Sequence, residues 1–121
     1  MSRVRVESMM QRVAVAKYED VRPGHMIGVD AAGTLVLVAN VGGILYAVDG
    51  RCTHGVGKLA EGTLDGYVVK CPVHGAMFDI RTGEVHKPRR NAYGMPVGGP
   101  ATANLRTYPV EEVDGQVFVD V

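Results

Sequence analysis

The chain has 121 residues, 13 basic and 13 acidic side chains, and a formal net charge of +0 at pH 7. This length suits one domain with its own hydrophobic core. The balanced charge argues against broad electrostatic binding to nucleic acid or to an anionic membrane. Residues 1–15 lack the apolar stretch of a signal peptide, and no apolar run reaches the length of a membrane span. We therefore expect a cytoplasmic protein with a short extension at 1–11 and a single domain at 12–121.

Taken in chain order, the sequence predicts many short β-strands and no long helix. A brief helical turn is expected at Tyr18–Val21, and tight hairpin turns at Ala32-Gly33, Gly42-Gly43 and Asp114-Gly115. Short strands with turn signals between them predict an all-β fold, an antiparallel barrel or sandwich. The expected strands are Arg12–Ala16, His25–Val29, Leu35–Ala39, Ile44–Val48, Tyr67–Lys70, Met77–Ile80, Leu105–Val110 and Val117–Val121.

Two short runs in the middle of the chain hold both of its cysteines. Cys52-Thr53-His54 and Cys71-Pro72-Val73-His74 are separated by sixteen residues, and each offers one thiolate and one imidazole. This is the ligand set of a Rieske [2Fe–2S] centre, in which two His replace two Cys on one iron. Two alternatives stay open: a tetrahedral zinc site, and a disulfide between the cysteines. The order Cys, His, Cys, His favours the cluster, because common zinc modules pair like ligands along the chain.

The residues around these runs resemble Rieske-type ferredoxins, the small electron carriers of bacterial non-haem iron oxygenase systems. The resemblance implies a Rieske-type β-barrel or sandwich base, a cluster-binding lobe inserted at about 49–87, and one [2Fe–2S] cluster. Cys52 and Cys71 would hold the inner iron, and His54 and His74 the outer iron. The motifs that carry it are Cys52-Thr53-His54-Gly55, Leu59-Ala60-Glu61-Gly62, Cys71-Pro72-Val73-His74-Gly75 and Phe78-Asp79-Ile80-Arg81-Thr82-Gly83.

By this resemblance the chain would take single electrons from a flavin-dependent NAD(P)H reductase and deliver them to a terminal oxygenase. Both partners would dock transiently at the tips of the two cluster loops. We expect no catalytic centre, because such oxygenases need a mononuclear iron held by two His and a carboxylate, and only His25 and His86 are left over. Two other functions stay open: the small subunit of an assimilatory nitrite reductase, and the Rieske subunit of a respiratory or arsenite-oxidising complex.

The residues next to the cluster runs predict a reduction potential at the low end of the Rieske range of roughly −150 to +300 mV. Respiratory members of the family donate hydroxyl hydrogen bonds to the cluster from a Ser and a Tyr, and the matching positions here are Ala76 and Phe78. Those members also join the two loops by a disulfide, where this chain has Val73 and either Val56 or Gly57. Fewer hydrogen bonds leave the reduced cluster less stabilised.

The segment 88–104 is rich in Gly and Pro and predicts a loop that is long for a compact domain. Rieske ferredoxins usually cross this region in fewer residues. We expect a surface insertion, with packing near the cluster or a partner as the alternative.

Overall fold

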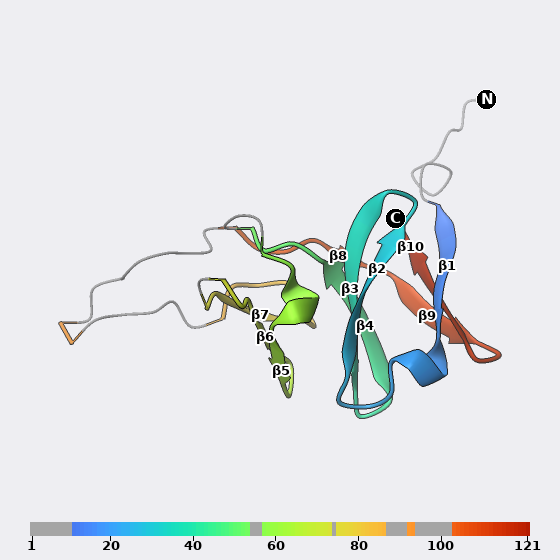
Figure 1. The fold of residues 1–121 in the computed structure, drawn as a ribbon, viewed down its shortest axis with the longest axis horizontal. Coiled ribbons are helices and arrows are strands. Elements are labelled where there is room, and N and C mark those ends of the chain that lie inside the picture. The colour runs from blue at the N-terminus through green and yellow to red at the C-terminus, as the bar shows by residue number, and fades with distance from the viewer. Residues whose placement is uncertain (1–10, 54–56, 74, 87–91, 94–102) are drawn as a thin grey trace.

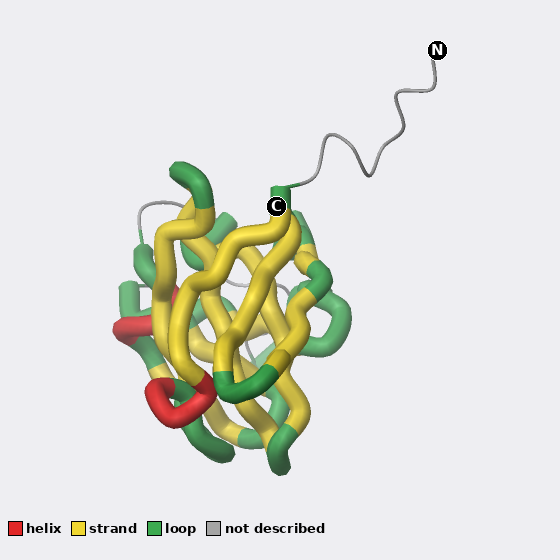
Figure 2. Tube along the Cα trace, turned by 90° about the vertical axis from the view of Figure 1, so that its right-hand side faces the viewer, coloured by secondary structure: helices red, strands yellow, loops and turns green. Residues whose placement is uncertain are grey.

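The computed structural model describes residues 11–53, 57–73, 75–86, 92–93 and 103–121. Within these ranges the regular structure is almost entirely β-strand, arranged in three antiparallel sheets (Figure 1). Two sheets form the base at the right of Figure 1, and the third forms a separate lobe to their left. Figure 2 shows the strands of the base packed in layers, with β1 and the C-terminal strand side by side. The all-β prediction is confirmed.

The sheets contain ten strands and are joined by two single-turn 3-10 helices. The first sheet has the order β1 (Arg12–Lys17), β10 (Gln116–Asp120) and β9 (Val110–Val113). The second has β2 (Met26–Ala31), β3 (Thr34–Val41), β4 (Ile44–Asp49) and β8 (Thr107–Tyr108). The third, called the lobe sheet below, has β5 (Thr63–Asp65), β6 (Val68–Lys70) and β7 (Met77–Asp79). The 3-10 helices are η1 (Tyr18–Asp20) and η2 (Leu59–Glu61).

The three predicted hairpin turns form where the sequence places them. Both central residues have positive φ in each turn, with values of 53° and 91° at Ala32-Gly33 and of 50° and 84° at Asp114-Gly115. Gly42-Gly43 is similar, with φ of 63° and 97°. This is the conformation that matches the right-handed twist of the flanking strands, and it favours glycine. The helical turn expected at Tyr18–Val21 is also confirmed, as η1.

The predicted strand Leu105–Val110 is wrong, because the chain changes sheets within it. Thr107 and Tyr108 pair with β4, whereas Val110 begins β9 and pairs with Val119 of β10. Pro109 lies between the two strands. Proline has no N–H to donate to a ladder and therefore interrupts strands. The short strand β5 and the helix η2 were not predicted.

Strand β3 is buried on both faces and divides the interior into two cores. Val36 and Val38 face the first sheet, where they pack with Val117 and Val119 of β10. Leu37 and Ala39 alternate with them and belong to the core shared with the lobe and both cysteines. Successive side chains of a strand point to opposite faces, and a strand covered on both faces reads as one continuous apolar run. The second sheet is therefore the platform on which the lobe rests.

Aromatic and charged contacts hold the lobe against this platform. The ring of Tyr46 in β4 meets Tyr67 edge to face, with centroids 6.0 Å apart. The guanidinium of Arg81 lies over the ring of Tyr67, 4.1 Å from its centroid. Asp79 fixes that guanidinium, with Arg81 Nη2 2.8 Å from Asp79 Oδ2, and hydrogen bonding to Arg81 lowers the pKa of Asp79. These contacts orient the lobe relative to β4.

The boundaries of the extension and the domain stay predictions, since residues 1–10 lie outside the described part. Gln11, which the prediction placed in the extension, exchanges backbone hydrogen bonds with Val121. Among the described residues, no helix has both the length and the apolar character required to span a membrane.

Candidate metal centre

The two cysteines lie at the base of two loops of the lobe. Loop 1 (residues 50–58) follows β4 and leads into η2, and loop 2 (residues 71–76) connects β6 to β7. Cys52 is 5% exposed and Cys71 is 1% exposed, and both belong to the core formed with Leu59 and Phe78. Neither cysteine forms a disulfide. Two thiols, one from each loop, are thus held in one apolar interior.

Each loop is closed by an equivalent backbone hydrogen bond. The N–H of Cys52 donates to the carbonyl of Gly57 at 2.9 Å, and the N–H of Cys71 donates to the carbonyl of Ala76 at 2.8 Å. In each case the acceptor lies five residues after the cysteine, so the described ends of the two loops are closed in the same way. In loop 2, Gly75 N–H also donates to the Cys71 carbonyl at 3.1 Å, and Gly75 has φ of 75°. Matching loops of this kind suit a ligand that takes one thiolate from each.

The two loops meet at Gly57. A Cβ built on Gly57 would lie 2.6 Å from Cys71 Sγ and 3.5 Å from Val73 Cβ. The sequence left open whether Val56 or Gly57 matches the disulfide position opposite Val73; Gly57 lies against Val73, and Val56 is outside the described residues. Val56, His54 and His74 lie outside the described residues, so the two imidazole ligands stay a prediction. The described donors nevertheless fit a cluster, because two buried thiols on adjacent loops can bind one iron.

The start of loop 1 is anchored by Asp49, the last residue of β4. Its Oδ2 accepts the N–H of Arg106 at 2.8 Å, and its Oδ1 accepts the hydroxyl of Tyr108 at 2.6 Å. The Asp49 N–H donates to the Arg106 carbonyl at 2.9 Å. Burial, together with the bond to Asp49, raises the pKa of Tyr108 to about 12. Strand β8 therefore holds the chain in place three residues before Cys52.

We expect this anchor to add alkali-sensitive stability. The pKa of Tyr108 is raised above its unfolded value of about 10. The stabilisation is therefore complete below about pH 10 and is lost as the pH rises towards 12. Tyr108→Phe should lower the free energy of unfolding by about 1–2 kcal/mol at pH 7. Urea unfolding at several pH values measures both effects. If the difference between the two proteins stayed constant from pH 9 to 12, the Tyr108–Asp49 bond would not be its source.

The far end of the long insertion returns to loop 1. Thr53 Oγ1 donates to the Ala103 carbonyl at 2.8 Å, and Asn104 Oδ1 accepts the N–H of Val85 at 3.1 Å. Leu105 is buried in the same core as the cysteines. Residues 87–91 and 94–102 lie outside the described part, so the path of the insertion stays a prediction. Ala103, near its end, bonds to Thr53, the residue that follows Cys52; both alternatives for the insertion, a surface segment or one packed near the cluster or a partner, stay predictions.

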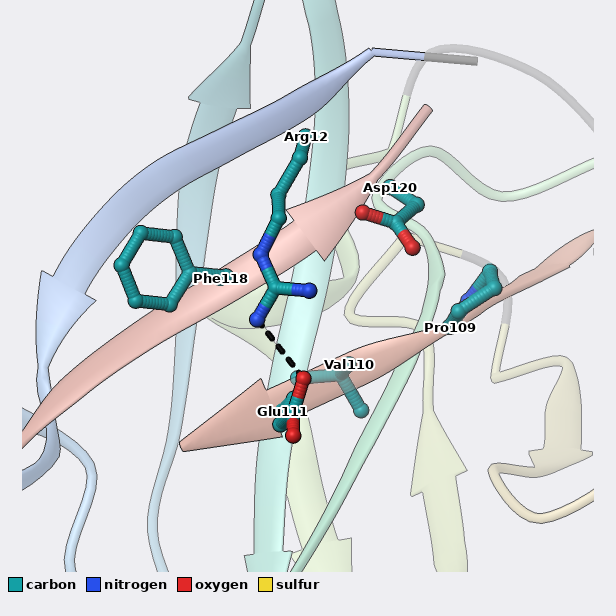
Figure 3. Close-up of a pocket in the computed structure, with 6 residues that line it drawn as sticks. All are labelled: Arg12, Pro109, Val110, Glu111, Phe118 and Asp120. Atoms are coloured by element: carbon teal, nitrogen blue, oxygen red, sulfur yellow. Dashed lines mark hydrogen bonds and ion pairs between the residues drawn. The ribbon is translucent and has the colours of Figure 1, made fainter. Parts of the chain in front are cut away.

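A hollow lies on the first sheet (Figure 3). This sheet lies on the side of the base away from the lobe (Figure 1). Arg12 crosses it, with its guanidinium 4.7 Å from the Phe118 ring centroid and 2.7 Å from Glu111 Oε1. Arg12 therefore interacts with both Phe118 and Glu111 within the hollow. Its lining residues are Arg12, Pro109, Val110, Glu111, Phe118 and Asp120.

Comparison with known families identifies the class. The Rieske [2Fe-2S] domain family matches residues 11–109, and the chain belongs to this family. The match decides the alternatives left open by the sequence: the cofactor is one [2Fe–2S] cluster rather than zinc. Family, fold and cysteine loops together define an electron-transfer protein, as the sequence predicted.

Individual relatives are ferredoxin components of dioxygenase systems. The chain is 39% identical over 106 residues to "Ferredoxin CarAc" of Metapseudomonas resinovorans, covering 87% of this chain and 89% of that protein. It is 34% identical over 108 residues to the ferredoxin component of the naphthalene 1,2-dioxygenase system of Pseudomonas aeruginosa, covering 89% and 92%. The 3-phenylpropionate/cinnamic acid dioxygenase ferredoxin subunit of Escherichia coli K12 is 35% identical over 113 residues, covering 93% and 95%.

Solved structures agree with this assignment. The ferredoxin of Sphingomonas yanoikuyae B1 matches with a TM-score of 0.76 and 30% identity, covering 92% of this chain and 99% of that one. A chain of the complex of reduced oxygenase and oxidized ferredoxin in carbazole 1,9a-dioxygenase matches with a TM-score of 0.72 and 37% identity, covering 89% and 91%.

The potential-setting positions can be tested directly. Ala76 carries the carbonyl that closes loop 2, and Phe78 is fully buried in the core with both cysteines. Neither side chain donates a hydrogen bond. We expect Ala76→Ser with Phe78→Tyr to raise the midpoint potential, because hydroxyl donors favour the more negative reduced cluster. About 1 kcal/mol of such stabilisation corresponds to about 40 mV for one electron. Redox titration measures the shift, and a folded double variant with an unchanged or lower midpoint would contradict the account.

Proposed function

We propose that this protein carries single electrons from a flavin-dependent NAD(P)H reductase to the terminal oxygenase of a ring-hydroxylating or related oxygenase system. The observation that carries the proposal is the pair of buried thiols on two loops closed by equivalent backbone hydrogen bonds, within a chain that matches ferredoxin components of dioxygenase systems over nearly its whole length. A [2Fe–2S] cluster takes up and releases one electron at a time, which suits it to connect a flavin reductase with an oxygenase iron.

The ligand assignment is part of the proposal. Cys52 and Cys71, both buried, would hold the inner iron. His54 and His74 follow in the same two loops and would hold the outer iron, nearer to solvent. The resulting oxidised cluster is neutral, because two thiolates and two sulfides balance two ferric ions. This neutrality makes reduction easier than in an all-thiolate cluster.

The docking face we infer is the tip of the two loops. Val73, next to His74, is 51% exposed although it is apolar, and Pro72 beside it is exposed too. An electron carrier must release its partner after each transfer, so the contact should be small, below roughly 1,200 Å² in total. A structural relative has been solved in complex with its oxygenase, which supports an oxygenase as one of the partners. The reductase as electron donor is inferred from the chemistry of such systems.

The named relatives favour an oxygenase system over the two other functions that the sequence left open, the nitrite reductase subunit and the respiratory or arsenite-oxidising subunit. The cytoplasmic location stays part of the proposal, and fractionation of the native host would test it.

The cofactor part of the proposal is tested by the purified protein. We expect a red-brown protein with about two irons per chain and visible absorption that bleaches on reduction with dithionite. The reduced form should give the electron paramagnetic resonance signal of a mixed nitrogen- and sulfur-ligated cluster. A colourless protein with one zinc per chain would overturn the proposal.

The partner part is tested by capture and reconstitution. Immobilised holoprotein should retain a flavoprotein reductase and a non-haem iron oxygenase from a lysate of the native host. The purified partners should then oxidise NAD(P)H and hydroxylate substrate only when this protein is added. Product formation at the same rate without it would show that electrons reach the oxygenase by another route.

A further inference from the structure

Gly57 contacts both cysteine loops at once. Its carbonyl accepts the N–H of Cys52 at 2.9 Å, which closes loop 1. On its other side the Cα faces loop 2, where a built Cβ would lie 2.6 Å from Cys71 Sγ and 3.0 Å from Val73 Cγ2. Gly57 is itself buried. One residue without a side chain therefore connects the backbone of the first cysteine with the sulfur of the second.

The reason for glycine here differs from the reason in the hairpin turns. Gly33 and Gly115 have positive φ, and a Cβ on either would meet nothing within 4 Å. Gly57 is not among the described residues with positive φ, but it has no room for a side chain. Separations below 3.0 Å are essentially never seen for real Cβ atoms, so an added methyl group must displace Cys71 Sγ or the loop that carries it. The missing side chain allows a close approach between backbone and sulfur, not a special turn.

We propose that Gly57 is a positioning residue of the cluster site, which sets the distance between the two loops and leaves room for Cys71 Sγ against its backbone. The inference rests on the proposed function, because it takes Cys71 as a cluster ligand. The surroundings of a ligand sulfur tune the potential of a cluster. A methyl group in this position would occupy the space beside Cys71 Sγ and change those surroundings.

Gly57→Ala is the direct test, with Gly28→Ala as the matched control. A Cβ on Gly28 would also be crowded, 3.2 Å from Ala60 Cβ, but would meet neither cysteine. We expect the Gly57→Ala holoprotein to lose its visible absorption at least about tenfold faster in excess EDTA, equivalent to about 1.4 kcal/mol. Its midpoint potential should also shift, because the methyl group lies beside the ligand sulfur. Gly28→Ala should keep the wild-type midpoint, because general crowding does not act on the sulfur.

A paired cysteine variant tests the loop contact without relying on the alanine variant. The built Gly57 Cβ lies 3.5 Å from Val73 Cβ, within the range of about 3.5–4.5 Å found in disulfides. Gly57→Cys with Val73→Cys should therefore oxidise to a disulfide in the holoprotein, so that neither added thiol reacts in a thiol titration after denaturation. A cysteine at position 57 carries the same Cβ as alanine, so if Gly57→Ala assembled no cluster, disulfide formation would be measured in the apoprotein of this variant.

The outcomes of these experiments distinguish the proposed function from the role of Gly57. A wild-type protein without two irons would defeat the proposed function whatever the variants do. A wild-type protein with two irons, together with a Gly57→Ala variant that matches it in EDTA resistance and midpoint, would overturn the role of Gly57 and leave electron transfer standing. Two free added thiols in the paired variant would likewise show that the loops do not meet at Gly57.

Discussion

Cys52→Ser and Cys71→Ser should each abolish cluster assembly. Both thiols are almost completely buried in the core between the lobe and the second sheet. A serine hydroxyl at either position keeps the size of the side chain, but it is a far weaker ligand for iron than a thiolate. We expect purified variants that are colourless and hold essentially no iron, as measured by iron analysis and visible absorption.

A control is needed because serine also adds a hydroxyl to the core. Val69→Thr places a hydroxyl at a fully buried position of β6 in the same core and removes no thiol. It should retain about two irons per chain. If the two serine variants kept their clusters, neither cysteine would be a ligand.

In the same series, a His74→Cys variant that holds a cluster should have a midpoint potential lower by on the order of hundreds of millivolts, because an anionic ligand replaces a neutral one.

Val73→Glu should slow electron delivery sharply while the cluster stays intact. Val73 is an exposed apolar residue beside the second proposed histidine ligand, at the centre of the face where we place the partner contact. A carboxylate there would have to be desolvated against the partner at each encounter, which costs affinity. We expect at least about tenfold lower NAD(P)H-driven product formation at limiting concentrations of this protein, with iron content unchanged.

Two controls separate docking from indirect effects. Val73→Gln has a similar shape without the charge, and its smaller effect would isolate the electrostatic part. Val113→Glu adds the same charge at a 40% exposed valine of β9, which lies on the far side of the base from the lobe (Figure 1), and it should leave turnover at the wild-type rate. Undiminished turnover with Val73→Glu would mean that electrons leave by another face. A midpoint shift would point to the cluster instead of the contact.

Local features of the fold were predictable, and features that depend on distant contacts were not. Turns such as Ala32-Gly33 form because a positive φ is a preference of the residues themselves. In contrast, the segment predicted as one strand at Leu105–Val110 is shared between two sheets. Its apolar and β-branched residues suit either sheet, so Pro109, which has no N–H for a ladder, was the signal in the sequence for where the chain crosses over.

The sequence by itself determined the kind of cofactor and the class of fold. Ligand chemistry belongs to side-chain identity, so two Cys and two His in two short runs were enough to predict a Rieske cluster, which the family match confirms. Only the folded structure showed that Gly57 lies against Val73, and that Ala103 at the end of the 88–104 insertion binds Thr53. These contacts join residues far apart in the chain, and they depend on how the lobe packs on the second sheet. The spacing of motifs and the hydrophobic periodicity of the sequence do not predict that packing, because these side chains come into contact only after the sheets have formed.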